Sequence, residues 1–173
     1  MAALTDERLR AVKGELDAQA VYREVKQTGD FVGFTRRFMH SDDGRVARNS
    51  FWVLTKATDQ ELSQLQGLLG ELIDLALKTE HTAVRRLSLN IIERLKMEED
   101  DLRTDFLDFC LDRMACVDEL PGIQSLSMKL AYRMCRFYPE LMAEFKVTLE
   151  SMETEYYKPA VNCVRNRILS GRL

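Results

Sequence analysis

The stretch HTAVRRLSLNIIERLKM, residues 81–97, decides the fold of this chain. Its apolar and small residues recur every three or four positions, the spacing of one face of an α-helix. That face consists of Val84, Leu87, Ser88, Ile91, Ile92 and Leu95. Bases occupy the opposite side of the same helix. The stretch therefore predicts an amphipathic helix with one buried face and one basic face.

The same pattern occurs four times along the chain. It begins at Val46, Val84, Ile123 and Val161, at spacings of 38, 39 and 38 residues, which is the period of two-helix repeats. A serine follows the starting residue by four positions in the first three copies, as Ser50, Ser88 and Ser127. We expect its hydroxyl to bond a carbonyl one helical turn earlier on the buried face. The fourth copy has Arg165 there, a departure typical of terminal repeats.

Each copy follows another apolar helical pattern, so the chain is predicted to fold as helix pairs. These preceding helices are expected at 31–39, 61–77, 102–115 and 141–152. The breaks carry a capping box at Thr58–Glu61, a turn at Ser41–Gly44, and three prolines near helix starts. Gly67 and Gly70 are interpreted as sites of tight helix packing. A further helix, from about Thr5 to Lys26 with Leu16 on its apolar side, is expected to cap the N-terminal end.

The predicted fold class is all-α, an α-α superhelix or solenoid of about four helix pairs plus an N-terminal helix. We predict a single domain over residues 1–173. Its parts are a capping helix at 1–28 and repeats at 29–57, 58–97, 98–138 and 139–173.

The paired helices resemble HEAT or armadillo-type repeats over residues 30–173. The segments DGRVAR (43–48) and HTAVRR (81–86) open second helices in the way these repeats do. More narrowly, ARNSFWVL (47–54), YPEL (138–141) and the closing basic helix resemble small bacterial HEAT-like proteins that are sometimes labelled adenylosuccinate lyases. The lyases carry a flexible Ser-rich loop with a catalytic serine, and catalytic histidines. This chain has only His40 and His81 and no such loop, so we expect no lyase activity.

The chain has a net charge of only −3, but its basic and acidic residues are concentrated in different segments. Residues 45–57, 81–97, 121–138 and 157–173 together contain 14 Lys and Arg but a single acid, Glu93. A surface that carries only positive charge raises the local concentration of anions near it. The HEAT resemblance implies that second helices line the concave surface, which would make it a basic groove.

The groove residues are predicted from the helical register, at about 100° per residue. Lys56, Arg94 and Arg133 share one position opposite the buried stripe, and Trp52, Asn90, Lys129 and Arg167 share another. The full predicted partner-binding set is Arg48, Trp52, Lys56, Arg86, Asn90, Arg94, Lys129, Tyr132, Arg133, Arg136 and Arg167.

Catalytic and metal-binding patterns are weak in this sequence. His40 and His81 have no ligand or nucleophile at a suitable spacing. The cysteines Cys110, Cys116, Cys135 and Cys163 lie in apolar helical patterns without a CxxC pair and are expected to be reduced thiols of the core. The acids from Asp101 to Asp112 lie on one helix face, either as a solvated surface or as ligands of a divalent cation. We expect no catalytic residue, resident metal or cofactor.

The predicted function is a non-catalytic adaptor or scaffold whose basic groove binds an acidic protein or peptide segment. The alternative is a nucleic-acid-binding protein related to the HEAT-like DNA glycosylases that excise alkylated bases. Those enzymes use an aspartate in the groove, which the basic helices lack, so catalysis is not expected even then. A third alternative is salt-sensitive self-association. No signal peptide and no membrane span are predicted, and we expect a cytoplasmic location.

Overall fold

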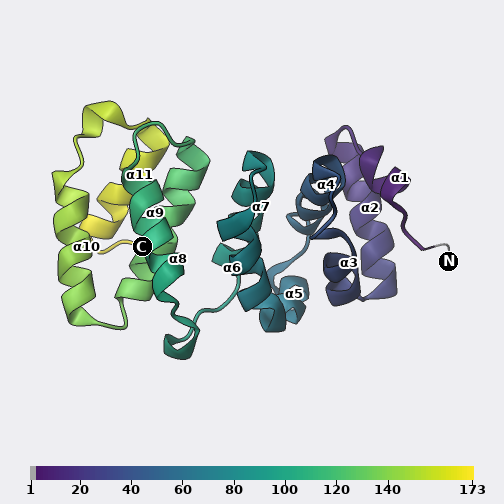
Figure 1. The fold of residues 1–173 in the computed structure, drawn as a ribbon, viewed down its shortest axis with the longest axis horizontal. Coiled ribbons are helices and arrows are strands. Elements are labelled where there is room, and N and C mark those ends of the chain that lie inside the picture. The colour runs from purple at the N-terminus through teal and green to yellow at the C-terminus, as the bar shows by residue number, and fades with distance from the viewer. Residues whose placement is uncertain (1–2) are drawn as a thin grey trace. The chain divides into compact units, whose positions relative to one another are not determined.

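The computed structural model describes residues 3–173, and within this range the fold is all-α with no strand (Figure 1). The chain forms two compact units, Met1–Lys96 and Met97–Leu173. This boundary falls at the predicted junction between the second and third repeats. A single domain over residues 1–173 remains a prediction.

Two helix pairs and the N-terminal helices make up the first unit. Its elements are α1 (Asp6–Arg10), α2 (Glu15–Thr28), α3 (Phe31–Phe38), α4 (Gly44–Leu54), α5 (Asp59–Leu62), the 3₁₀ helix η1 (Ser63–Leu68), α6 (Leu69–Lys78) and α7 (Thr82–Arg94). The second helices α4 and α7 pack against each other, and α3 and α6 pack against α4 and α7 respectively. The side chain of Asp43 accepts the N–H groups of Arg45 and Val46, which fixes the start of α4.

The N-terminal helix differs from its prediction. The chain forms two helices, α1 and α2, because the carboxylate of Asp17 accepts the backbone N–H groups of Lys13 (3.0 Å) and Gly14 (3.2 Å) and starts a new helix there. Leu16 was predicted on the apolar face but is 83% exposed, since Ala18, Val21 and Val25 form the buried face of α2. Both helices pack against α4.

The predicted helix at 61–77 is also interrupted. It begins with the expected capping box, in which Thr58 and Glu61 each accept the other's backbone N–H. The helix then tightens into η1 before α6 starts at Leu69. The packing interpretation of Gly67 and Gly70 is wrong, because a Cβ added at either position would meet nothing within 4 Å.

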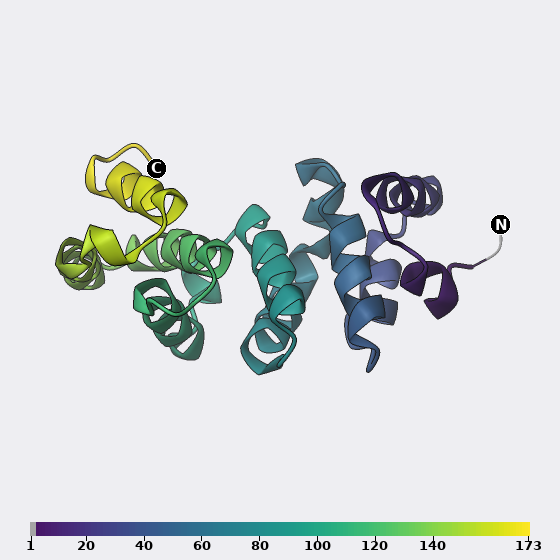
Figure 2. The same ribbon diagram turned by 90° about the horizontal axis from the view of Figure 1, so that it is seen from above.

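The second unit contains the remaining two pairs. Its elements are the 3₁₀ helix η2 (Glu99–Asp101), α8 (Thr104–Ala115), α9 (Pro121–Cys135), α10 (Pro139–Ser151), the 3₁₀ helix η3 (Thr154–Tyr156) and α11 (Pro159–Leu169). Each of the three prolines is the first residue of its helix, where a missing N–H costs no intrahelical bond. Helix α9 contacts α8, α10 and α11 (Figure 2).

The repeated stripe forms the core of both units, as predicted. All six of its residues are buried in α7 and in the α4 copy, and five of six in the α9 copy, where Leu126 is half-buried. The hydroxyls of Ser50 and Ser88 donate to the carbonyls of Ala47 (2.7 Å) and Arg85 (3.0 Å). The buried hydroxyl of Ser127 has no hydrogen-bond partner.

Candidate binding surface

The predicted groove residues divide between the two units. Six come from the first unit and five from the second: Arg48, Trp52, Lys56, Arg86, Asn90 and Arg94, then Lys129, Tyr132, Arg133, Arg136 and Arg167. None of the eleven is buried, in agreement with a position opposite the core stripe. Each unit is therefore described as a surface of its own.

One of these residues is held by a carboxylate. The ammonium of Lys56 lies 2.6 Å from Glu15 Oε1 and 2.7 Å from Oε2. The hydrogen bond from Lys56 is the main reason that the pKa of Glu15 falls below its ordinary value. Glu15 is the first residue of α2 and Lys56 follows α4, so this contact joins the end of α4 to the helix that packs on it. Trp52 is half-buried.

Arg94 also acts within the fold. Its guanidinium donates to the carbonyls of Ala57 (2.6 Å) and Thr55 (3.2 Å) and to Asp59 Oδ1 (2.9 Å). The two carbonyls lie just beyond the C-terminal end of α4, where helix carbonyls lack intrahelical partners. Arg94 therefore joins the second repeat to the end of the first.

Two further arginines donate hydrogen bonds to carbonyls near the end of the other helix in their helix pair. The sequence did not predict this role. Arg85 of α7 donates to the carbonyls of Ala76 (3.0 Å) and Thr79 (2.6 Å) at the end of α6. Arg165, which replaces the repeated serine in α11, donates to the carbonyl of Leu149 (2.7 Å) near the end of α10. We call Lys56, Arg85, Arg94 and Arg165 the tied bases.

Six other bases on the second helices or at their ends contact no carboxylate and no backbone carbonyl among residues 3–173. We call them the open bases: Arg45, Arg48, Arg86, Lys129, Arg136 and Arg167. Arg48 donates only to the neutral side chain of Asn49, and the guanidinium of Arg136 lies 5.7 Å from the ring centre of Tyr132. The ring of Tyr132 also packs near Phe145, with centroids 6.3 Å apart.

Bases outside the basic segments include paired and unpaired residues. Arg8 pairs with Glu24 and Arg103 with Asp105, each at 2.8 Å, and Arg113 pairs with Glu119 at 3.0 Å. Arg23 and Lys78 are exposed and form no ion pair within residues 3–173, so a base without an acidic partner is not peculiar to the basic segments.

Two of the open bases line a hollow of about 530 Å³ in the first unit. Its walls are Arg10, Asp43, Gly44, Arg45, Arg48 and His81, from the end of α1 and the starts of α4 and α7. Arg10 donates to Asp43 at 2.7 Å, and this hydrogen bond is the largest cause of the lowered pKa of Asp43. Of the residues that line the hollow, only Arg48 was predicted as a site residue. The signal for it was that DGRVAR and HTAVRR open equivalent helices, which brings Gly44 and His81 to neighbouring helix starts.

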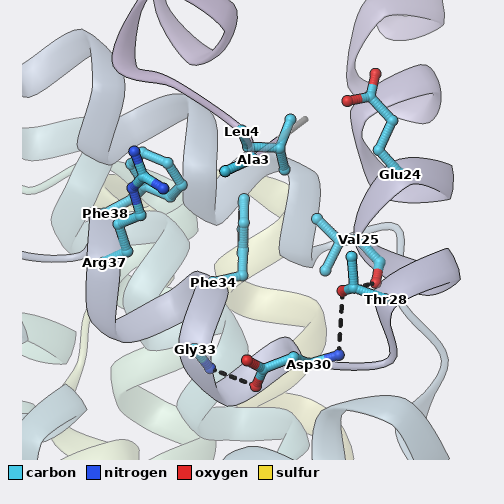
Figure 3. A pocket seen from close by; sticks show the side chains of 10 residues that line it. All are labelled: Ala3, Leu4, Glu24, Val25, Thr28, Asp30, Gly33, Phe34, Arg37 and Phe38. Atoms are coloured by element: carbon cyan, nitrogen blue, oxygen red, sulfur yellow. Dashed lines mark hydrogen bonds between the residues drawn. The ribbon is translucent and has the colours of Figure 1, made fainter. Parts of the chain in front are cut away.

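A second hollow of about 330 Å³ lies between α2 and α3 (Figure 3). Leu4, Val25, Phe34 and Phe38 give it an apolar wall, with Asp30 at one edge accepting the N–H of Gly33 (2.7 Å). None of its residues was a predicted site residue.

The core position predicted for the cysteines holds for two of the four: Cys110 and Cys135 are buried, whereas Cys116 is half-buried and Cys163 is exposed. All four are free thiols. Burial raises the pKa of the Cys110 thiol, and it raises that of Cys135 to about 11. Within residues 3–173, no cluster of three or more His, Cys, Asp or Glu is placed to hold a metal ion. In the same range, no helix has the length and apolar character needed to cross a membrane.

Comparison with known proteins gives one match. A family model described as a HEAT repeat domain matches residues 5–172, nearly the whole chain. No curated protein and no solved structure matches.

Proposed function

The chain belongs to the HEAT repeat domain family, whose members commonly serve as scaffolds for protein–protein interaction, and we propose that this one is a non-catalytic adaptor for an acidic protein segment. The observation that carries the proposal is the set of open bases. They lie on the second helices of both units, opposite the buried stripe, and no carboxylate among residues 3–173 neutralises them.

Charge and chemistry both favour an acidic partner. Four of the open bases, Arg45, Arg86, Arg136 and Arg167, are exposed, so their guanidinium groups can form bidentate hydrogen bonds with carboxylates without moving the helices. Exposed charges of one sign steer an oppositely charged segment and determine which partner binds. A protein partner is favoured over nucleic acid because the guanidinium of Arg136 lies 5.7 Å from the ring centre of Tyr132, which also packs near Phe145. Less of this ring is then open for stacking on a base, which nucleic-acid grooves exploit.

The test is the binding of a Glu-rich peptide to the full chain at low salt. We expect the combined variant Arg86→Gln, Lys129→Gln, Arg167→Gln to bind roughly tenfold more weakly, because each exposed charge pair contributes up to about 1 kcal/mol. The matched control is Lys13→Gln, Arg23→Gln, Lys78→Gln, which removes the same charge from exposed residues outside the basic segments. Equal weakening in both variants would leave only a general charge effect and contradict the proposal.

Partner capture from cell lysate, with and without nuclease, supplies the competing outcome. If the captured partners are lost after nuclease treatment, and the chain binds duplex or single-stranded nucleic acid with an affinity that falls steeply as salt is added, the surface is assigned to nucleic acid instead. A size-exclusion mass that decreases as salt is added would assign it to self-association.

A further inference from the structure

We propose that the basic hollow at the starts of α4 and α7 binds a phosphate group, carried on a phosphorylated Ser or Thr side chain of the acidic partner segment. This inference rests on the proposed function for the partner, and two of the residues assigned to the phosphate, Arg45 and Arg48, are open bases. It concerns the walls of the hollow: Arg10, Asp43, Gly44, Arg45, Arg48 and His81.

The hollow has an excess of positive charge. Three arginines line it against one carboxylate, Asp43. That carboxylate already accepts Arg10 Nε–H (2.7 Å) and the backbone N–H groups of Arg45 (2.9 Å) and Val46 (3.4 Å). Arg45 has no side-chain partner among residues 3–173, and Arg48 donates only to the neutral Asn49. Two guanidinium groups are therefore left with donors for an anion.

His81 adds a neutral donor whose tautomer is fixed by the fold. Its Nδ1 accepts the backbone N–H of Val84 (3.4 Å) as the N-terminal cap of α7. In the neutral ring the proton is then on Nε2, which becomes a donor. The Nε2 edge faces Gly44, where an added Cβ would lie 2.6 Å from His81 Cδ2 and 3.1 Å from Nε2. The missing side chain of Gly44 thus brings the ring against the start of α4, on the wall of the hollow.

The composition of the walls selects phosphate over other anions. Guanidinium groups match the oxygens of phosphate in bidentate geometry and bind a dianion more strongly than a single carboxylate. Helices α4 and α7 also begin at the hollow, and the N-terminal end of a helix carries partial positive charge that favours an anion. No Phe, Tyr or Trp among residues 3–173 lines the hollow, so it lacks the large aromatic rings on which nucleobases commonly stack. Its volume of about 530 Å³ also accommodates the side chain that carries the phosphate.

The experiment uses the two histidines of the full chain as reporters. At about pH 8, where an ordinary imidazole is neutral, the ring signals of His81 and His40 are followed by NMR during titration, with chloride keeping the ionic strength constant. The probes are inorganic phosphate, an acidic peptide with one phosphoserine, and the same peptide with serine. We expect phosphate and the phosphopeptide to shift the His81 signals and leave those of His40 unchanged. His40 lines a different hollow together with the acids Glu71 and Asp74.

Variants then assign the effect to the hollow. Arg45→Gln with Arg48→Gln should weaken phosphate binding about tenfold or more, and Arg45→Gln alone, which breaks no contact within residues 3–173, should weaken it in the same direction. The control Arg23→Gln removes one exposed charge from α2, outside the hollow and the basic segments, and should leave phosphate binding unchanged. Equal loss in the control, or unmoved His81 signals, would overturn the site.

The peptide comparison separates this inference from the proposed function. We expect the phosphopeptide to bind about tenfold more tightly than the serine peptide, and the double arginine variant to abolish this difference. If both peptides bind the parent chain equally, the phosphopeptide inference fails while the acidic-partner proposal stands. If inorganic phosphate shifts the His81 signals but the phosphopeptide binds no more tightly than the serine peptide, the anion site is supported. A phosphorylated side chain of the partner is then ruled out as the source of the phosphate.

Discussion

Each unit carries both tied and open bases on its second helices, and the contrast is clearest between Lys56 with Arg94 in the first unit and Lys129 with Arg167 in the second. Lys56 and Arg94 pair with Glu15 and Asp59, and these contacts hold one element of the unit to the next. Lys129 and Arg167 have no acidic partner among residues 3–173. A basic surface read from a repeat pattern therefore has to be divided into residues that hold the fold and residues that are available for binding.

The largest expected effect is on the stability of the first unit. Arg94→Gln removes the ion pair with Asp59 and leaves the carbonyls of Thr55 and Ala57 without their donor. Hydrogen bonds to charged groups contribute about 2 kcal/mol, so we expect the free energy of unfolding to fall by about that amount. Urea denaturation measures it. Arg86→Gln, on the same helix, should stay within about 0.5 kcal/mol of the parent, and equal losses in the two variants would remove the distinction between tied and open bases.

A second comparison concerns the repeated serine. Ser88→Ala removes a hydrogen bond of 3.0 Å to the Arg85 carbonyl and should cost about 1 kcal/mol of unfolding free energy. Ser127→Ala should be neutral or stabilising, because the buried hydroxyl of Ser127 has no partner. Thermal or urea unfolding of both variants checks this. A larger loss for Ser127→Ala would mean that its hydroxyl is paired in solution.

Much of this could be predicted from the sequence, because a buried stripe is a periodic property. The period of 38 to 39 residues placed α4, α7, α9 and α11 and most of their buried residues, although it missed others such as Phe51 and Met128. The break between α1 and α2 was missed because it depends on local hydrogen bonds that Asp17 accepts from two backbone N–H groups. Helical register likewise placed Lys56 and Arg94 on the surface, but whether a surface base meets an acid depends on contacts between elements, such as that of Arg94 with Asp59.

The smallest expected effect is a dependence of the first unit on acidity. The pKa of Glu15 is lowered by Lys56, and that of Asp43 by Arg10. A folded-state pKa below the unfolded value means that each ion pair contributes fully above the unfolded pKa, near 4, and is lost as pH falls through the folded value. We expect the stability of the first unit to decrease as pH drops below about 4.5, and Glu15→Gln to reduce that decrease. Amide exchange measured across this range tests it, and an unchanged pH profile in the variant would contradict the pairing.

The most direct test of the account compares two double variants that remove the same charge from the full chain. One changes the open bases, Lys129→Gln with Arg167→Gln, and the other the tied bases, Lys56→Gln with Arg94→Gln. Both are measured for unfolding free energy and for affinity toward the Glu-rich peptide. We predict that the open pair loses affinity and keeps its stability, whereas the tied pair loses stability and keeps its affinity. The reverse pattern, or equal losses of affinity in both, would contradict the account.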